Sequence, residues 1–364
     1  MSKPTLTRIV QTLQERVDSG FYAPTAALPP ERVLAEELHV SRVTLRAALQ
    51  TLAESGVLHR AHLRWVVTNH RPSRLAATTI GFWCVHGADA LISGILSAGI
   101  QRALDPVRHH LVVANAPFSA LVSSEKLLKT EREWIDLVAS DPNIAGVIFW
   151  YSGRPENVPA LHALQQTGKP MVFLDRMPPD DIQADFVGVD NQEAAYQVVA
   201  HLIAQGHRRI AHVTSSDQVS TVYERLTGYR RALAETGLPD DPSLILPDAF
   251  HVDRDFAEGF VAMPDRPTAI FCVHDYSAHN VIKTLRELEV RVPEEIAVAG
   301  FDGWEETTGQ PPTLTTAFQP IRRIGEAAAR LILRRLESLP DPYQTRLLLE
   351  APLRIHASTQ HRVY

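Results

Sequence analysis

From Thr79 onward, the chain alternates short apolar runs with amphipathic segments of helical periodicity, and this alternation restricts its possible folds more than any other feature. The apolar runs are TIGFWCV, HLVVANA, AGVIFWY, PMVFLDR, RIAHVTS, PTAIFCVHD and EEIAVAGFD. Apolar strands separated by helices are typical of parallel sheets covered by helices on both faces. We therefore predict an α/β region with parallel sheets over residues 79–359.

Charged and aromatic residues cluster directly after these apolar runs. Ligands of parallel sheets bind beyond the carboxyl ends of the strands, so these residues are candidates for a small-molecule site. They are His86, Asp89, Trp150, Tyr151, Asp175, Arg176, His274, Asp275, Asp302 and Trp304. The pattern predicts a polar binding site at a sheet edge.

The first 70 residues follow another pattern, that of three short helices and two short strands. Apolar residues recur at helical spacing between Leu6 and Val17, which predicts a first helix. A second helix is expected to begin after Pro30 and to end near Val40. Its inward-facing residues are expected to be Val33, Leu34 and Leu38. The stretch VLHRAHLRWVV is expected to form the two strands.

The third helix of this region is expected to carry arginines on its outer side. Ser41 can cap its start, because a serine hydroxyl accepts from the free backbone N–H groups of the first turn. Its inner stripe is Leu45, Ala48, Leu49 and Leu52, which leaves Arg42, Arg46 and Gln50 on another side. A helix that follows a short turn and has arginines in its first turns is the arrangement that enters a DNA major groove.

The charge distribution supports this division of the chain. Residues 1–75 hold ten Lys and Arg against six acidic residues, a net charge of +4, whereas the whole chain carries -6. The remaining 289 residues therefore carry -10. This asymmetry indicates a segment that binds a polyanion, joined to a larger segment that repels one.

Composition places the chain among ordinary globular proteins with two or three domains. Its 364 residues contain only two cysteines, Cys84 and Cys272, each within an apolar run, so we interpret both as buried hydrophobic residues. No apolar run reaches the length of a membrane span, and the first segment has charges at helical spacing where a secretion signal would be apolar. We predict a cytoplasmic protein without a membrane contact, metal or cofactor.

Two other classes of function remain as alternatives. An enzyme is disfavoured because the sequence has no P-loop, no GxGxxG after a strand, no HExxH and no GxSxG. A transport binding protein is disfavoured by the missing secretion signal and by the candidate DNA-binding helices.

The stretch LPPERVLAEELHVSRVTLRAALQTLAESGVL resembles the winged helix-turn-helix of the GntR family of transcription factors, over nearly all of residues 4–68. The resemblance implies an α+β DNA-binding domain over residues 1–70. It also implies contacts with phosphates and base edges from Arg32, Ser41, Arg42, Thr44 and Arg46, and from His62 and Arg64 of the wing. The wing departs from the family, because its sequence HRAHLRWVV has no glycine.

The region after the linker, residues 71–78, resembles the effector-binding domain of the LacI family, which is similar in fold to periplasmic sugar-binding proteins. Five motifs carry the resemblance: VGVDNQEAAYQVVAHLIAQGHRRIAHV, ERLTGYRRALAETGL, PTAIFCVHD, VPEEIAVAGFDG and LTTAFQPIRRIGEAAARLILRRL. It implies two subdomains joined by three crossovers. One subdomain is expected over about 79–189 and 321–348, the other over about 190–320 and 349–359.

The same resemblance implies a set of effector contacts. They are His86, Asp89, Trp150, Arg176, Thr221, Arg225, Phe250, His274, Asp302 and Gln319. His274 stands where the family commonly has asparagine. Guanidinium, carboxylate and aromatic groups together suit a carbohydrate, with a purine or another metabolite as the alternative. We expect a homodimeric repressor that its effector releases from double-stranded operator DNA, although an effector that acts as co-repressor is also open.

Overall fold

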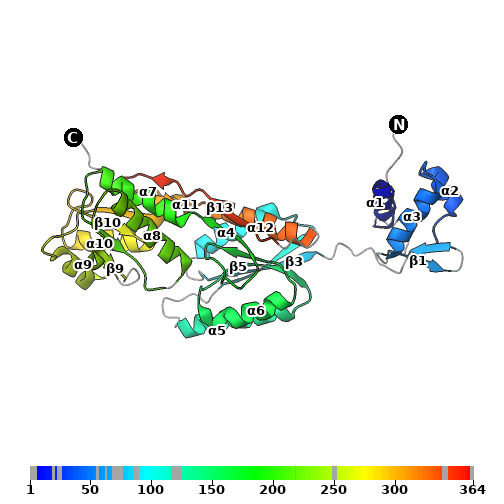
Figure 1. Cartoon of the computed structure of the whole chain (residues 1–364), viewed down its shortest axis with the longest axis horizontal. Coiled ribbons are helices and arrows are strands. Elements are labelled where there is room, and N and C mark those ends of the chain that lie inside the picture. Colours follow the sequence, from blue (N-terminus) through cyan, green and yellow to red (C-terminus); the bar gives the residue numbers. More distant parts are fainter. Residues whose placement is uncertain are drawn as a thin grey trace. The chain divides into compact units, whose positions relative to one another are not determined.

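The chain is described here by a computed structural model, which covers residues 6–18, 21–22, 27–54, 57–61, 64–67, 77–85, 90–115, 124–217, 219–247, 252–337 and 343–360. It divides into two compact units, Met1–Thr78 and Thr79–Tyr364, and each is described by itself (Figure 1).

The N-terminal unit has three helices followed by a two-stranded hairpin. The elements are α1 (Leu6–Asp18), α2 (Glu31–Glu37), α3 (Arg42–Glu54), β1 (Leu58–Ala61) and β2 (Arg64–Val67). The two strands pair antiparallel, with Leu58 opposite Val67 and Ala61 opposite Arg64. This is the predicted winged helix-turn-helix, and the fold class of the unit is confirmed.

Helix α3 begins and packs as its sequence predicts. The Ser41 hydroxyl accepts a hydrogen bond from the Thr44 backbone N–H at 3.1 Å, which satisfies a donor of the first helical turn. The inner stripe is buried in the core of the unit and consists of Leu45, Ala48, Leu49 and Leu52. Arg42, Arg46 and Gln50 are exposed on the outer side, so the helix presents two cations to solvent.

The prediction for α2 was wrong at Val33. Leu34 and Ala35 are buried and Leu38 is partly buried, whereas Val33 is 40% exposed. Successive residues of a helix are rotated by about 100°, so Leu34, Ala35 and Leu38 lie on one side and Val33 lies outside that side. A helix of seven residues buries only this narrow face.

The C-terminal unit contains two six-stranded sheets. The first has the order β13-β7-β6-β5-β3-β4. Its strands are β3 (Thr78–Cys84), β4 (His109–Asn115), β5 (Ile144–Trp150), β6 (Met171–Leu174), β7 (Asp185–Val189) and β13 (Arg346–Leu349). The pairs β13–β7, β7–β6, β6–β5 and β5–β3 are parallel.

The second sheet has the order β14-β12-β11-β10-β8-β9. Its strands are β8 (Ile210–Val213), β9 (Ile245–Leu246), β10 (Ala269–Cys272), β11 (Ala297–Asp302), β12 (Thr315–Phe318) and β14 (Leu353–Arg354). All its pairs are parallel except β12–β14. The predicted parallel sheets are therefore confirmed.

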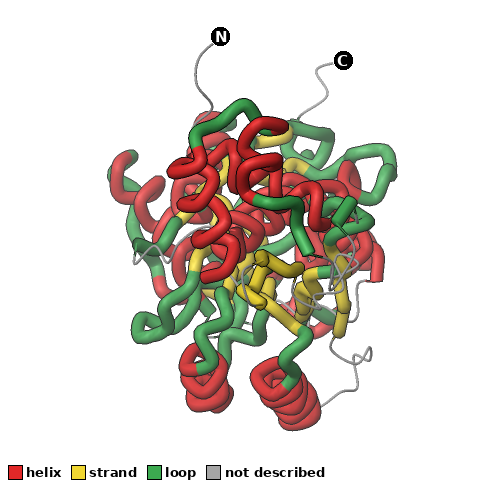
Figure 2. Tube along the Cα trace, turned by 90° about the vertical axis from the view of Figure 1, so that its right-hand side faces the viewer, coloured by secondary structure: helices red, strands yellow, loops and turns green. Residues whose placement is uncertain are grey.

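Helices cover both faces of each sheet (Figure 1, Figure 2). Those packed with the first sheet are α4 (Ala90–Ala103), α5 (Ser124–Ser140), α6 (Val158–Gln166) and α12 (Ile321–Glu337). Those packed with the second are α7 (Asn191–Ala204), α8 (Ser220–Glu235), α9 (Arg254–Val261) and α10 (Asp275–Glu287). The short α11 (Trp304–Thr307) and the 3₁₀ turns Pro155–Asn157 and Pro242–Leu244 complete the described elements.

Two helix pairs approach closely because glycines stand at their contacts. A Cβ atom on Gly99 of α4 would lie 2.2 Å from the Arg322 carbonyl oxygen of α12. A Cβ on Gly228 of α8 would lie 2.2 Å from the Gln192 carbonyl oxygen of α7. Any larger residue would push these helices apart, so the glycines set the distance between the two helices of each pair.

The chain passes three times between the two sheets, after β7, after β12 and after β13. Each sheet therefore combines segments that are far apart in sequence, and the two-subdomain class predicted for this unit is confirmed. None of the helices in the residues covered above combines the length and apolar character needed to cross a lipid bilayer.

Candidate functional site

The N-terminal unit presents cationic side chains on α2 and α3. Arg46 is exposed, and its Nη2 and Nε atoms donate to Glu31 Oε2 at 2.7 and 3.3 Å. Arg32 Nη1 donates to Glu36 Oε1 at 2.8 Å. Arg42 lies four residues before Arg46, so both project from one side of α3.

Hydroxyl groups stand at the N-terminus of α3, beside these arginines. The Ser41 and Thr44 hydroxyls are 2.7 Å apart. A helix N-terminus with exposed hydroxyls favours an anion such as a DNA phosphate. Arg64 is exposed at the start of β2. His62, the other predicted wing residue, lies outside the described residues.

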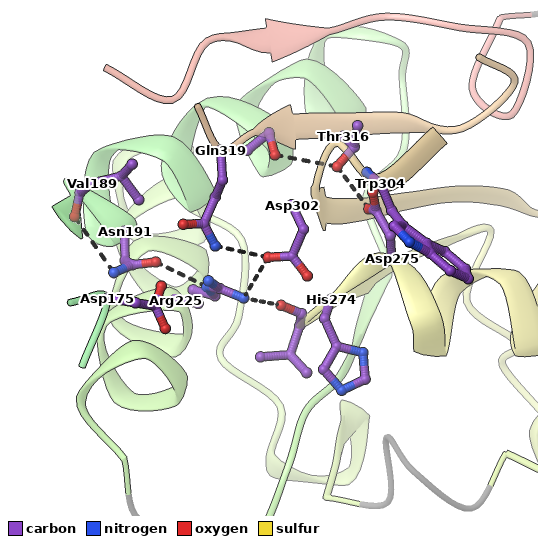
Figure 3. A network of polar contacts seen from close by, with 12 residues as sticks. Asp175, Val189, Asn191, Arg225, His274, Asp275, Asp302, Trp304, Thr316 and Gln319 are labelled. Atoms are coloured by element: carbon purple, nitrogen blue, oxygen red, sulfur yellow. Dashed lines mark hydrogen bonds and ion pairs between the residues drawn. The ribbon is translucent and has the colours of Figure 1, made fainter. Parts of the chain in front are cut away.

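In the C-terminal unit, a polar network centres on the buried Arg225 of α8 (Figure 3). Its Nε donates to Asn191 Oδ1 at 3.0 Å, and its Nη1 donates to the Val273 carbonyl at 2.6 Å. The same Nη1 lies 3.5 Å from Asp302 Oδ1. The guanidinium carbon is 3.7 Å from the centre of the Phe301 ring. Packing and hydrogen bonds thus fix this cation in one orientation.

Asp302 ends β11 and pairs with Gln319, which follows β12. Gln319 Nε2 donates to Asp302 Oδ1 at 2.9 Å, and the Gln319 backbone N–H donates to the Asp302 carbonyl at 3.0 Å. Asp302 has a φ of 122°, a strained backbone conformation for a residue other than glycine. Burial raises the pKa of Asp302 to about 6, against the opposing effect of Arg225.

The first sheet contributes a second group of polar residues from the ends of β5 and β6. Trp150 Nε1 donates to Asp175 Oδ2 at 3.1 Å. Arg176 Nη1 donates to the carbonyls of Tyr151 and Ser152 at 3.1 and 2.6 Å. Burial lowers the pKa of Arg176. Asp175 lies next to Arg225 in Figure 3, and its charge contributes to the raised pKa of Asp302, so the groups from the two sheets lie close together.

His274 and Thr221 border the network from α10 and α8. His274 is the N-cap of α10, and its Nδ1 accepts from the Ser277 backbone N–H at 3.0 Å. Burial, with a smaller effect of Arg225, lowers the pKa of His274 to about 4, so this side chain is neutral at physiological pH. Thr221 is buried on α8, one turn before Arg225.

Among the predicted effector contacts, the structure joins Arg225, Asp302 and Gln319 directly. Trp150 and Arg176 lie on the side of the first sheet, and His274 and Thr221 lie next to the elements that carry Arg225. Three predicted contacts fall outside the described residues: His86, Asp89 and Phe250.

Some residues of the network were not among the predicted contacts. Asn191 begins α7 at the first crossover, and Phe301 supplies the ring beneath Arg225. Asp175 follows β6 and, like Asp275, was among the strand-end candidates, although not among the predicted effector contacts. Asp275 accepts from the Trp304 backbone N–H at 2.7 Å and from the Thr316 hydroxyl at 2.7 Å, which anchors the segment after Asp302 (Figure 3).

Several buried polar atoms of this region have no hydrogen-bond partner among the described residues. They are Asp175 Oδ1, Arg176 Nε and Gln319 Oε1. Buried polar atoms are nearly always hydrogen-bonded, and a polar ligand could supply partners for such atoms. The described residues include no cluster of His, Cys, Asp or Glu with the geometry of a metal site.

Comparisons with known protein families match both units. Residues 5–64 match the bacterial regulatory proteins of the gntR family. Residues 199–359 match the periplasmic binding protein-like domain.

Individual relatives agree with these matches. The chain is 31% identical over 278 residues to the HTH-type transcriptional repressor PurR of Photobacterium profundum, which covers 74% of this chain and 80% of that protein. The transcription regulator CcpA of Lactococcus lactis has a TM-score of 0.65 at 22% identity, covering 78% and 100% of the two chains. A LacI family regulator from Enterococcus faecium with bound ribose has a TM-score of 0.63 at 24% identity, covering 77% and 98%.

Proposed function

Because the chain belongs to the family of LacI-type transcriptional regulators and carries a gntR-type DNA-binding domain, we propose that it is a repressor released from operator DNA by a carbohydrate. The C-terminal unit, residues 79–359, senses the effector, and the N-terminal unit, residues 1–70, binds DNA. The segment 71–78 links them. Its relatives are transcriptional repressors rather than enzymes, so the small molecule is a signal and not a substrate.

The observation that carries the proposal is the network of Arg225, Asp302 and Gln319, near which buried acceptor atoms lack hydrogen-bond partners among the described residues. Sugar hydroxyls both donate and accept, so one hydroxyl can accept from a fixed guanidinium and donate to a neighbouring carboxylate. Gln319 Oε1 and Asp175 Oδ1 are buried acceptors without partners among the described residues. A ligand rich in O–H donors would satisfy them. The ribose held by the Enterococcus regulator supports this choice.

A purine is the second candidate. The curated relative at 31% identity is named PurR, and a nucleobase also offers N–H donors to carboxylate and amide oxygens. The two ligand classes differ in shape, because a sugar places hydroxyls around its ring whereas a purine is flat.

A ligand panel with two readouts tests the function. We expect one monosaccharide or small glycoside, among sugars, polyols and nucleobases, to raise the melting temperature. Saturation at about 100 times the Kd stabilises the folded unit by ~2.7 kcal/mol. The same compound should release operator DNA, and operator DNA should weaken its binding by the same factor. Stabilisation by a nucleobase alone would identify the purine alternative, and tighter operator binding would indicate a co-repressor.

We expect effector affinity to depend on pH through Asp302. Its pKa of about 6 means that the carboxylate accepts hydrogen bonds fully only at higher pH, while His274 stays neutral above its pKa of about 4. Effector affinity should therefore fall about tenfold from pH 7.5 to pH 5. Titration calorimetry across this range measures the change. Asp302→Asn should bind weakly and without this pH dependence, and an unchanged pH profile in that variant would assign the titration to another group.

On DNA, the protein acts as a cytoplasmic homodimer that binds an inverted-repeat operator, since two-fold proteins recognise two-fold sites. Base and phosphate contacts come from Arg32, Ser41, Arg42, Thr44 and Arg46, with Arg64 and His62 on the wing. Bound effector changes the relative position of the two subdomains and thereby the geometry in which the dimer presents its two DNA-binding units.

A further inference from the structure

We propose that Glu31 is a positioning residue for DNA recognition, which holds Arg46 of the recognition helix and the wing strands β1 and β2 (Leu58–Ala61 and Arg64–Val67) in one fixed arrangement. The inference rests on the proposed contact of Arg46 with operator DNA. In this role Glu31 contacts no base itself and affects DNA recognition only through Arg46.

One carboxylate joins three elements of the N-terminal unit. Glu31 is the first residue of α2. Its Oε2 accepts from Arg46 Nη2 at 2.7 Å and from Arg46 Nε at 3.3 Å, on α3. Its Oε1 accepts from Trp65 Nε1 at 3.2 Å, on β2. Both oxygens are thus used, one for the recognition helix and one for the wing.

Burial and charge make this contact more than a surface ion pair. The Glu31 side chain is 21% exposed, and Trp65 is 7% exposed, so the indole N–H depends on this carboxylate for its partner. The hydrogen bond from Arg46, followed by that from Trp65, lowers the pKa of Glu31, which therefore stays anionic at neutral pH. The Arg46 side chain is 69% exposed and reaches solvent beyond the contact.

The contact with Glu31 leaves the end edge of the Arg46 guanidinium available for DNA bases. A guanidinium has five N–H groups, and Glu31 engages those on the side edge, Nε and one from Nη2. The second hydrogen of Nη2 and one hydrogen of Nη1 lie on the end edge, which can pair with O6 and N7 of guanine. Because Glu31 restricts the arginine beforehand, less side-chain freedom is lost when DNA binds.

The negative charge of Glu31 favours operator binding through Arg46, but it weakens the binding of DNA of any sequence. An anion on the DNA-facing side of the domain repels every phosphate, whatever the base sequence. A residue kept for positioning should therefore raise the ratio of operator affinity to random-DNA affinity, while a purely structural residue should change only stability.

The test compares Glu31→Gln with Glu37→Gln, which removes the same charge from the same helix. Glu37 binds Arg16 at 2.7 Å and does not contact Arg46. Affinities are measured by fluorescence anisotropy for an operator selected from random-sequence DNA with the wild-type protein, and for a scrambled duplex. We expect Glu31→Gln to lower the affinity ratio about tenfold, because an amide has one acceptor oxygen for two donors. Glu37→Gln should keep the ratio of the wild type.

A second comparison shows whether Glu31 acts through Arg46. In the background of Arg46→Ala, Glu31→Gln should no longer change the ratio. The inference would be overturned if Glu31→Gln lowered the affinity ratio equally in the wild-type and Arg46→Ala backgrounds, or if it left the ratio of the wild type unchanged. Full operator affinity in Arg46→Ala would refute the DNA contact of Arg46 itself, and the positioning role with it. Glu31→Asp retains the charge but is one methylene too short to reach both partners, so it serves the same comparison if the amide variant is unstable.

Discussion

Replacement of Arg225 by alanine is expected to weaken effector binding by about 100-fold and to abolish release of operator DNA by the effector. Arg225 is buried and fixed by Asn191, the Val273 carbonyl and Asp302, so its loss removes hydrogen bonds to a charged group and leaves acceptors unpaired. A loss of this size corresponds to ~2.7 kcal/mol. Titration calorimetry of the effector identified by the ligand panel measures it, and anisotropy measures operator affinity, which should stay that of the wild type.

The matched control is Arg230→Ala. Arg230 lies on the same helix, α8, and pairs at the surface with Asp240 at 3.0 Å. The Arg230→Ala variant should keep the effector response, since Arg230 lies outside the network. Asp302→Asn preserves the shape of the site and should lose the response even if Arg225→Ala lowers thermal stability. Effector affinity retained in both network variants would refute the site, and a parallel loss in Arg230→Ala would indicate a general defect of the unit.

Much of the fold follows from local pattern. The seven apolar runs became β3, β4, β5, β6, β8, β10 and β11. Six of these strands are mostly buried, and a strand buried on both faces must be apolar along its length, whereas the edge strand β4 is partly or fully exposed at every residue. Strand β7 does not fit that pattern, since it begins with the buried Asp185. Arg335 compensates this charge through bonds of 2.6 and 2.8 Å, from 150 residues further along the chain. No local pattern reports such a partner.

The helices of the N-terminal unit show the same limit on a smaller scale. The stripe on α3 was predictable because four apolar residues repeat at helical spacing over 13 residues. Helix α2 has seven residues, too few for a repeat to identify its buried side, and Val33 was assigned wrongly. The bonds of Glu31 to Arg46 and Trp65 depend on how three elements meet, which the sequence pattern does not express.

For the effector site, the rule that ligands bind at strand ends selected Arg176, His274 and Asp302, and family resemblance added Arg225 and Gln319. The structure joins three of these five directly. Asn191 and Phe301 could not be selected, because an asparagine at a helix start and a phenylalanine in a strand have ordinary structural roles. Asn191 reaches Arg225 from the first crossover between the sheets, and Phe301 contacts Arg225 from β11, so both contacts join residues that are far apart in sequence.

Replacement of Arg42 by alanine is expected to weaken operator binding by about 1 to 3 kcal/mol, roughly 5- to 150-fold, where a base contact is lost. The side chain is exposed in the first turn of α3, so its removal should leave the core of Leu45 and Leu49 intact and the melting temperature unchanged. Arg46→Ala should have an effect of similar size. Anisotropy at several salt concentrations separates the two kinds of contact, since loss of a phosphate contact reduces the salt slope by about one.

The control for Arg42→Ala is Arg132→Ala, which removes one positive charge from α5 in the effector unit, where Arg132 pairs with Asp136 at 3.5 Å. It should leave operator affinity unchanged. A homodimer on an inverted repeat doubles the consequence of each substitution, because both half-sites lose the contact, so the variant should lose more affinity for a full operator than for one half-site. Unchanged operator affinity in both Arg42→Ala and Arg46→Ala would refute the recognition helix. Equal losses on the full operator and on a half-site would instead indicate that one chain binds alone.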